Sequence, residues 1–178
     1  MAPVSDRKAR SRRLLTLAGA GERVIVERRT SEVTRIEAAP GRSARTFLDT
    51  NILVYADDTS DPVKQKTAVA LILHHMQQRS GVVSTQVLQE YFVAVKRKFK
   101  ADSARAKEKV ELYATFEVAR PDLGDILAAI DLLRLHGFSY WDALVLRMAK
   151  QSGCRILLTE DMQHGREIDG VRIVNPFL

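Results

Sequence analysis

Residues 46 to 178 are predicted to form an α/β fold, an α/β/α sandwich with a mostly parallel central sheet. Short apolar runs alternate in this range with longer segments whose apolar residues recur three and four positions apart. These two patterns are typical of buried strands and of amphipathic helices. Because parallel strands need a crossover connection, the alternation favours helices on both faces of a single sheet.

Residues 1 to 45 differ from the rest of the chain in charge. They contain eleven lysines and arginines and five acids, whereas residues 46 to 178 contain seventeen of each. The net charge of +6 therefore belongs to a basic N-terminal extension. Two short strands, Arg23–Arg29 and Val33–Ile36, are predicted within it, and Ala38–Ser43 has the composition of a linker.

The main domain begins with a strand-like apolar run, Phe47–Val54, that contains a single carboxylate, Asp49. Burying a carboxylate in apolar surroundings is unfavourable by several kcal/mol unless a cation or strong hydrogen-bond donors compensate. We therefore expect Asp49 to form one wall of a metal site. The loop after the run contains Asp57 and Asp58, which are expected to be solvated.

The remaining elements follow from capping residues and apolar spacing. Asp61 and Pro62 form a good N-cap and first helical position, and apolar spacing continues that helix to Arg79, with His74 and His75 expected on its surface. The sequence then predicts strands near 82–84, 116–118, 155–158 and 171–174, and helices at 85–99, 103–115, 122–135 and 139–151.

Four acids are predicted to meet at one edge of the sheet. Asp49 lies on the first strand, and Asp161 comes immediately after the predicted strand Ile156–Glu160. If both strands are central and parallel, both acids emerge at the same edge. Glu90, on the helix after the second strand, and Asp142, in the first turn of a later helix, can overhang that edge.

A cluster of carboxylates raises its own pKa values by mutual repulsion unless divalent cations neutralise it. Mg²⁺ or Mn²⁺ suits an oxygen-only site, and one or two such ions can activate a water and stabilise the leaving 3′-oxygen of a phosphodiester. The single cysteine, Cys154, leaves no set of cysteines and histidines for zinc.

Each acid also has a purely structural interpretation. Asp142 lies at capping-box spacing from the start of its helix and can simply act as a cap. Glu90 can be a solvated helix residue, and Glu160 and Asp161 can form a loop turn. Asp49 has the weakest structural alternative because its surroundings are apolar.

Basic residues gather at the end of the helix that carries Glu90: Lys96, Arg97, Lys98 and Lys100. Cations near a helix C-terminus are stabilised by the helix dipole. The same residues can contact the phosphate backbone of RNA. The sequence supports these two interpretations about equally.

These features together resemble the PIN-domain ribonucleases, in particular the VapC toxins of bacterial toxin-antitoxin pairs. The resemblance rests on the opening Phe47–Ile52, on Glu90 and on Phe138–Leu144. Leu157–Gly165 and the ending Ile173–Phe177 complete it. The matches span residues 46 to 178 in the right order, and their combination is highly specific.

The resemblance implies a divalent-metal-dependent endoribonuclease that uses Mg²⁺ or Mn²⁺, forms a homodimer and is blocked by a cognate antitoxin. It also implies roles for individual residues. The implied catalytic residues are Asp49, Glu90, Asp142 and Asp161, of which Asp49, Asp142 and Asp161 would bind metal, with Thr50, Asn51 and Thr159 orienting the carboxylates or the metal-bound waters.

The extension of residues 1 to 45 departs from this family, whose members usually begin near the first strand. Its predicted strand pair weakly resembles Phd-type antitoxins, although the turn Thr30–Glu32 lacks the usual glycine. An antitoxin remnant fused in frame, a start assigned too early and a flexible basic arm all remain open.

Two other functions compete with a toxin ribonuclease. One is a DNA-directed nuclease of the same superfamily. The other is a nucleic-acid-binding regulatory module without catalysis, whose basic arm binds DNA through salt-sensitive contacts. No stretch approaches the roughly 20 apolar residues of a membrane span, so we expect a cytoplasmic protein that makes no use of a membrane.

Overall fold

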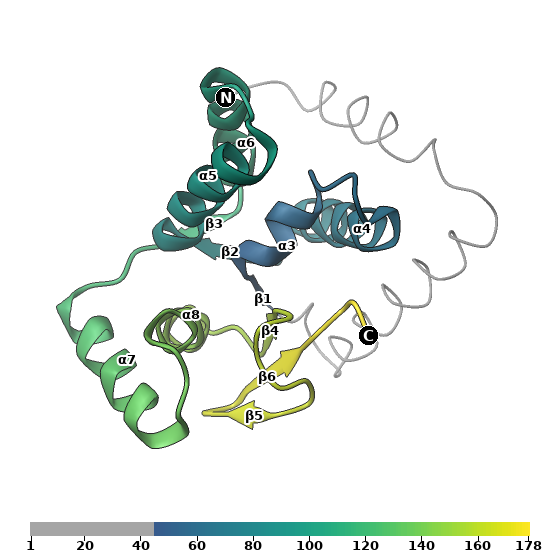
Figure 1. The fold of residues 1–178 in the computed structure, drawn as a ribbon. Helices are drawn as coiled ribbons and strands as arrows, with labels where there is room; N and C mark the ends of the chain where they lie inside the picture. Colours follow the sequence, from purple (N-terminus) through teal and green to yellow (C-terminus); the bar gives the residue numbers. More distant parts are fainter. Residues whose placement is uncertain (1–44) are drawn as a thin grey trace.

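Six strands form one sheet in the order β3-β2-β1-β4-β6-β5 (Figure 1). The structure is a computed structural model that describes residues 45 to 178. Neighbouring strands are parallel except β5 and β6, which are antiparallel. The strands are β1 (Thr46–Leu48), β2 (Gly81–Ser84), β3 (Glu117–Ala119), β4 (Ile156–Leu158), β5 (Glu167–Ile168) and β6 (Val171–Val174).

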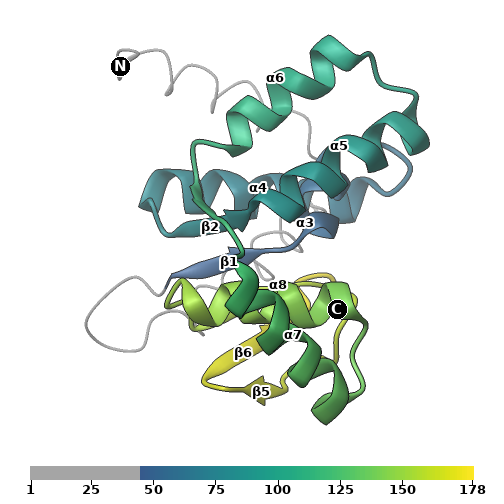
Figure 2. The ribbon, with the colours of Figure 1, turned by 90° about the vertical axis from the view of Figure 1, so that its left-hand side faces the viewer.

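Helices cover both faces of this sheet. Helices α7 and α8 pack together on one face, and α3 and α4 lie on the other, with α5 against α3 and α6 against α5 (Figures 1 and 2). The predicted α/β/α sandwich is therefore confirmed. The helices are α3 (Thr50–Tyr55), α4 (Pro62–Gln78), α5 (Thr85–Phe99), α6 (Ser103–Tyr113), α7 (Leu123–His136) and α8 (Tyr140–Gln151).

Short polar side chains start the helices at the positions that the sequence indicates. Asp61, Ser84, Asp122 and Ser139 are N-caps whose side chains accept backbone N–H groups of the first turn. Such caps satisfy donors that have no partner within the helix. The caps of α5 and α8 matter most for function, because they fix the first turns of the helices that carry Glu90 and Asp142.

Three strands, β1, β2 and β4, are wholly buried, as expected for strands covered by helices on both faces. Between α5 and α6, Tyr91 and Tyr113 pack edge to face with ring centroids 5.1 Å apart. The positions at the carboxyl ends of β1 and β4 are therefore held by a rigid core.

The strand predicted for Phe47–Val54 is wrong in its second half. Strand β1 ends at Leu48, and Asp49 is the N-cap of helix α3, with its side chain accepting Thr50 N–H. A short apolar run cannot be assigned to strand or helix from periodicity alone. In α3 only Ile52 and Leu53 are buried, which is too few residues to show a helical repeat.

Three further details differ from the prediction. Strand β5 was not predicted, although Asp169–Gly170, both with positive φ, form the kind of turn that signals a hairpin. His75, expected at the surface, is fully buried. Asp58, expected to be solvated, is also buried and pairs with Lys98 from α5 at 2.6 Å.

The proposed division of the chain at residue 45 stays a prediction. The two strands predicted for Arg23–Arg29 and Val33–Ile36 lie outside the described residues. Among residues 45 to 178, no helix is long and apolar enough to cross a membrane.

Candidate active site

The candidate site lies where the strand order reverses, between β1 and β4. From β1 the chain proceeds outward to β2 and β3 on one side, and β4 and β6 lie on the other. At such a point the connections leave the sheet in opposite directions and open a crevice at the carboxyl ends of the strands. Leu48 pairs with Leu158 at those ends, so Asp49 and Thr159 are neighbours.

Asp49 is the most buried acid of the site, with 6% of its surface exposed. Its carboxylate accepts hydrogen bonds from Thr50 N at 2.6 Å, from Thr159 Oγ1 at 2.7 Å and from Asn51 Nδ2 at 3.1 Å. Burial raises the pKa of Asp49 to about 7, the hydrogen bonds from Thr159 and Thr50 oppose that rise, and the charges of Asp161 and Glu90 add to it. A nearby cation would favour its ionised form.

Asn51 joins two of the predicted acids. Its Nδ2 lies 3.1 Å from Asp49 Oδ2, 3.0 Å from Asp161 Oδ2 and 3.1 Å from Thr159 Oγ1. Its Oδ1 is buried and has no hydrogen-bond partner within the described part of the chain. Asn51 therefore holds the two carboxylates beside each other and leaves one acceptor free for a water or a cation.

Glu90 is held from two sides and is not a freely solvated helix residue. Its Oε2 accepts a hydrogen bond from Thr50 Oγ1 at 2.7 Å, and its Oε1 accepts one from Gln86 Nε2 at 2.8 Å. Gln86 is only 6% exposed, and its Oε1 has no partner among residues 45 to 178. The sequence analysis missed Gln86, although its position one turn before Glu90 places the two side chains on one helix face.

Asp142 combines the capping interpretation with a place in the site. Ser139 Oγ accepts Asp142 N–H at 3.1 Å and donates to Asp142 Oδ2 at 2.8 Å. This pair fixes the first turn of α8 and orients the carboxylate. The other oxygen, Oδ1, makes no hydrogen bond within residues 45 to 178.

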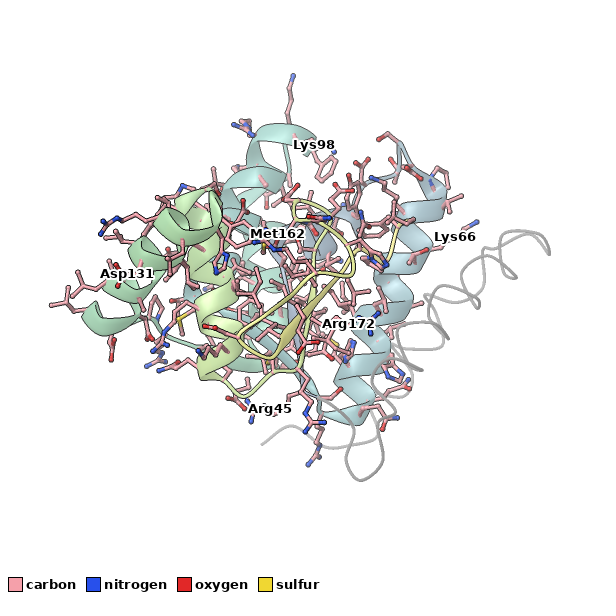
Figure 3. All side chains as sticks on the ribbon, turned by 90° about the horizontal axis from the view of Figure 1, so that it is seen from below. Arg45, Lys66, Lys98, Asp131, Met162 and Arg172 are labelled. Carbon is pink, nitrogen blue, oxygen red and sulfur yellow. The ribbon has the colours of Figure 1, made fainter. Side chains whose placement is uncertain are left out.

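All four predicted acids line one open groove of about 490 Å³. Of the four basic residues at the end of α5, Arg97 and Lys98 line it, and Lys96 and Lys100 do not. Lys98 also pairs with Asp58, so its role is partly structural. Lys98 and Arg45 lie at opposite ends of the molecule (Figure 3), which places the groove away from the start of β1.

A fifth acid, Glu160, lines the groove but is already neutralised. Lys64 Nζ lies 2.6 Å from Glu160 Oε2 and 2.9 Å from Tyr55 OH, and Tyr55 OH hydrogen-bonds to Glu160 Oε1. Burial raises the pKa of Tyr55, and its bond to Glu160 adds to the rise. Tyr55 and Glu160 of this group line the groove. Tyr55 lies on α3, which the sequence did not predict, and Lys64 lies on α4, which was predicted without a role for this side chain.

The donor set fits a hard divalent cation that keeps several waters. The site offers carboxylate oxygens together with the buried amide oxygen Asn51 Oδ1, which has no partner among the described residues. Such oxygens bind Mg²⁺ or Mn²⁺ directly or through bound waters. Within residues 45 to 178 no group of three or more acids, histidines or cysteines is arranged so that it could hold a metal ion, so in this geometry waters would have to supply most of the ligands.

The comparisons with known proteins agree with this geometry. No curated protein matches the chain in sequence. Among solved structures, the chain is similar to VapC20 of Mycobacterium tuberculosis, described as a toxin that cleaves the sarcin-ricin loop. The two share 20% identity and a TM-score of 0.54 over 63% of this chain and 86% of that one.

A second similar structure is VapBC2 from Rickettsia felis, described as bound to a DNA fragment from its promoter. It shares 17% identity and a TM-score of 0.54 over 72% of this chain and 96% of that one. At such identities the likeness concerns the fold. The sequence profile of the PIN domain, however, matches residues 46 to 166, most of the described domain. The chain therefore belongs to the PIN-domain family.

Proposed function

We propose that the chain is a divalent-metal-dependent endoribonuclease and the toxin of a type II toxin-antitoxin pair. The observation that carries the proposal is the convergence of Asp49, Glu90, Asp142 and Asp161 on one groove at the strand-order reversal of a PIN domain. The similarity to VapC20, described as a sarcin-ricin-loop-cleaving toxin, supports RNA as the substrate.

The acids would divide the work as follows. Asp49, Asp142 and Asp161 would hold Mg²⁺ or Mn²⁺, which when bound supplies charge neutralisation for the phosphate and a more acidic water. Glu90, which accepts hydrogen bonds from Thr50 and Gln86, would accept a proton from a water in the groove.

The supporting residues would keep the acids in position. Thr159 and Asn51 fix Asp49 and Asp161 relative to each other through their hydrogen bonds, and such outer contacts commonly tune metal affinity. Arg97 and Lys98 at the rim of the groove would attract the phosphate backbone.

The proposed partners are an RNA substrate, a second copy of the chain and a cognate antitoxin. The similar structure from Rickettsia felis is described as VapBC2 bound to promoter DNA, and by analogy an antitoxin would block the groove of this chain. The homodimer and the cytoplasmic location remain predictions.

The test is cleavage of a pool of structured and single-stranded RNAs, with single-stranded DNA in parallel, in Mg²⁺, in Mn²⁺ and in EDTA. The full chain should cut RNA only with metal, and Asp49→Asn should lower the rate by a factor of at least about 100, the scale on which electrostatic groups act in catalysis. Asp131→Asn is the matched control, because Asp131 is exposed at an outer edge of the molecule (Figure 3).

Three results would contradict the proposal. Equal cutting by wild type and Asp49→Asn, or cutting that EDTA does not affect, would remove the acid groove from the reaction. Cutting of DNA alone would favour a DNA-directed nuclease, and binding of nucleic acid without cutting would favour the regulatory module.

A further inference from the structure

A second cavity lies beside the acidic groove, at the junction of α5, α7 and α8. It measures about 470 Å³ and its lining includes Gln86, Gln89, Arg120, Tyr140 and Trp141. We propose that this cavity, here called the base pocket, binds a nucleobase of single-stranded RNA beside the phosphate that is cut. The proposal rests on the proposed function and names the part of the substrate that the protein grips.

The base pocket is continuous with the acidic groove. Gln86 and Trp141 line both cavities. Each is also tied to a predicted catalytic acid, because Gln86 donates to Glu90 at 2.8 Å and Trp141 directly precedes Asp142. An RNA strand whose phosphate lies at the acids therefore has an adjacent nucleotide within reach of the base pocket.

The aromatic wall of the base pocket suits stacking. Trp141 is 57% exposed although it is the largest apolar side chain in the chain. Its ring packs edge to face on Tyr140, with centroids 5.1 Å apart, which limits its orientation. Single-stranded RNA is commonly bound by stacking its unpaired bases on such aromatic side chains.

The polar lining matches the other parts of a nucleotide. Gln86 Oε1 is a buried acceptor without a partner in residues 45 to 178, and the exposed amide of Gln89 supplies donors and acceptors for a base edge. Arg120 is exposed and forms no ion pair with another described residue. No acid lines the base pocket, in contrast to the groove.

Apolar walls complete the cavity. Pro121, Ile126 and Leu144 also line it. A base slotted between apolar and aromatic surfaces loses contact with water on its faces while its edge stays near the amides. Stacking on the face of a base does not depend on which base is bound. Preference among the bases would come from hydrogen bonds between the base edge and the amides of Gln86 and Gln89.

The chain offers a direct probe of the base pocket, since Trp141 is its only tryptophan. The full chain carrying Asp49→Asn, which should not cut, would be titrated with single-stranded RNA of roughly eight nucleotides, within the usual site size. We expect the tryptophan emission to be quenched by RNA and not by an abasic ribose-phosphate strand of equal length. Equal quenching by both, or none by either, would overturn the proposal.

A second experiment tests the pocket in the cutting enzyme. A short RNA that the wild type cleaves would be remade with an abasic site at each position near the cut. At one flanking position the abasic site should raise the KM of wild type by about 5- to 150-fold, the scale of one stacked base. In Trp141→Ala the same abasic site should have little further effect, whereas Trp141→Phe should restore the wild-type pattern.

Leu135→Ala is the matched control, because Leu135 is 75% exposed on α7 and lines neither cavity. Its abasic pattern should equal that of wild type. Trp141→Ala could instead lower kcat equally for all the RNAs while the abasic site at the flanking position still raises KM as in wild type. That result would show that the substitution disturbs Asp142, and it would overturn the base pocket. Absence of any metal-dependent cutting by wild type would overturn the proposed function, and the fluorescence titration would then decide RNA binding separately.

Discussion

Three hydrogen-bond donors hold the carboxylate of Asp49 at the end of β1. Thr50 N, Asn51 Nδ2 and Thr159 Oγ1 lie 2.6, 3.1 and 2.7 Å from its oxygens. Hydrogen bonds to an ionised carboxylate lower its pKa, whereas burial raises it, and burial is the stronger effect here. At the scale of single residues, the site thus contains a buried carboxylate, Asp49, whose neighbours donate hydrogen bonds to it but carry no neutralising positive charge.

Replacing Thr159 by valine should weaken metal binding. The change keeps the shape of the side chain but removes the donor to Asp49 Oδ2, so we expect a loss of about 10- to 100-fold in Mn²⁺ affinity, as for other outer contacts of metal sites. Calorimetric titration with Mn²⁺ measures it. Thr115→Val removes an exposed hydroxyl that bonds only Leu112 O and should change nothing. An unchanged affinity in Thr159→Val would refute the role given to this hydroxyl.

Replacing Asn51 by aspartate should make the fold dependent on metal. The amide donor that now lies between Asp49 and Asp161 would become a third carboxylate, and we expect a loss of about 1–3 kcal/mol in EDTA, or about 2–4 °C in Tm for each kcal/mol. Thermal unfolding with and without Mn²⁺ measures it. Mn²⁺ should restore more stability to Asn51→Asp than to Asn51→Ala, and equal recovery would argue against a cation at this place.

At the scale of elements, the sequence predicts the longer helices that carry Glu90 and Asp142, but it does not predict the short elements α3 and β5. Caps and apolar spacing place α5 and α8, and hence Glu90 and Asp142, from sequence. Helix α3 and strand β5 were missed because six and two residues are too few to show a period. The miss had a consequence, since α3 presents Thr50, Asn51 and Tyr55 to the groove.

The start of β2 depends on a glycine for reasons of space. A Cβ on Gly81 would lie 2.7 Å from ring carbons of Phe116 and 3.1 Å from His75 Cβ. We therefore expect Gly81→Ala to lower the free energy of unfolding by about 1–3 kcal/mol, as other overpacked cores do. Urea unfolding measures it. In the double variant with Phe116→Leu the cost of Gly81→Ala should shrink, and strictly additive effects would show that Phe116 is not the obstacle.

At the scale of the whole molecule, the order of the strands decides where chemistry can occur. Asp49 and Asp161 are distant in sequence, yet β1 and β4 are adjacent and parallel. Their carboxyl ends therefore open into one crevice. The same rigid sheet places α5 and α8 over that crevice, so that the acidic groove and the base pocket share Gln86 and Trp141.

Global stability should fall in mild acid because of His75. Burial, and next the charge of His74, lower the pKa of His75 to about 3 from its usual 6.5. The unfolded chain thus binds a proton that the folded chain does not, between about pH 6.5 and about pH 3. This group stabilises the fold fully above about pH 6.5, and its contribution declines by about 1.4 kcal/mol per pH unit below that value.

Urea unfolding of wild type and His75→Gln at about pH 7.5, 6 and 5 tests this expectation. The variant should be less stable at the highest pH, since it disturbs the contact of His75 Nδ1 with Ser80 Oγ at 2.9 Å, but its stability should decline less steeply with acid. His164→Gln is the matched surface control. Parallel declines in wild type and His75→Gln would contradict the prediction.

The sequence by itself determined the α/β/α class and the elements that bear the four predicted acids, which the structure brings to one groove. Local patterns suffice for this, because burial leaves a period in the sequence and caps leave short polar residues at helix starts. It also showed the motifs of the PIN domain from Phe47 to Phe177. Their order along the chain allowed Asp49 and Asp161 to be placed at one edge of the sheet.

Only the tertiary structure decided which other side chains reach that edge. Gln86 meets Glu90, Lys64 neutralises Glu160, and Lys98 is drawn toward Asp58. The base pocket likewise exists only where α5, α7 and α8 meet. A contact between distant segments produces no periodicity or motif in a single sequence. The pattern of each element reports only which of its faces is buried, and not which side chain of another element lies against it.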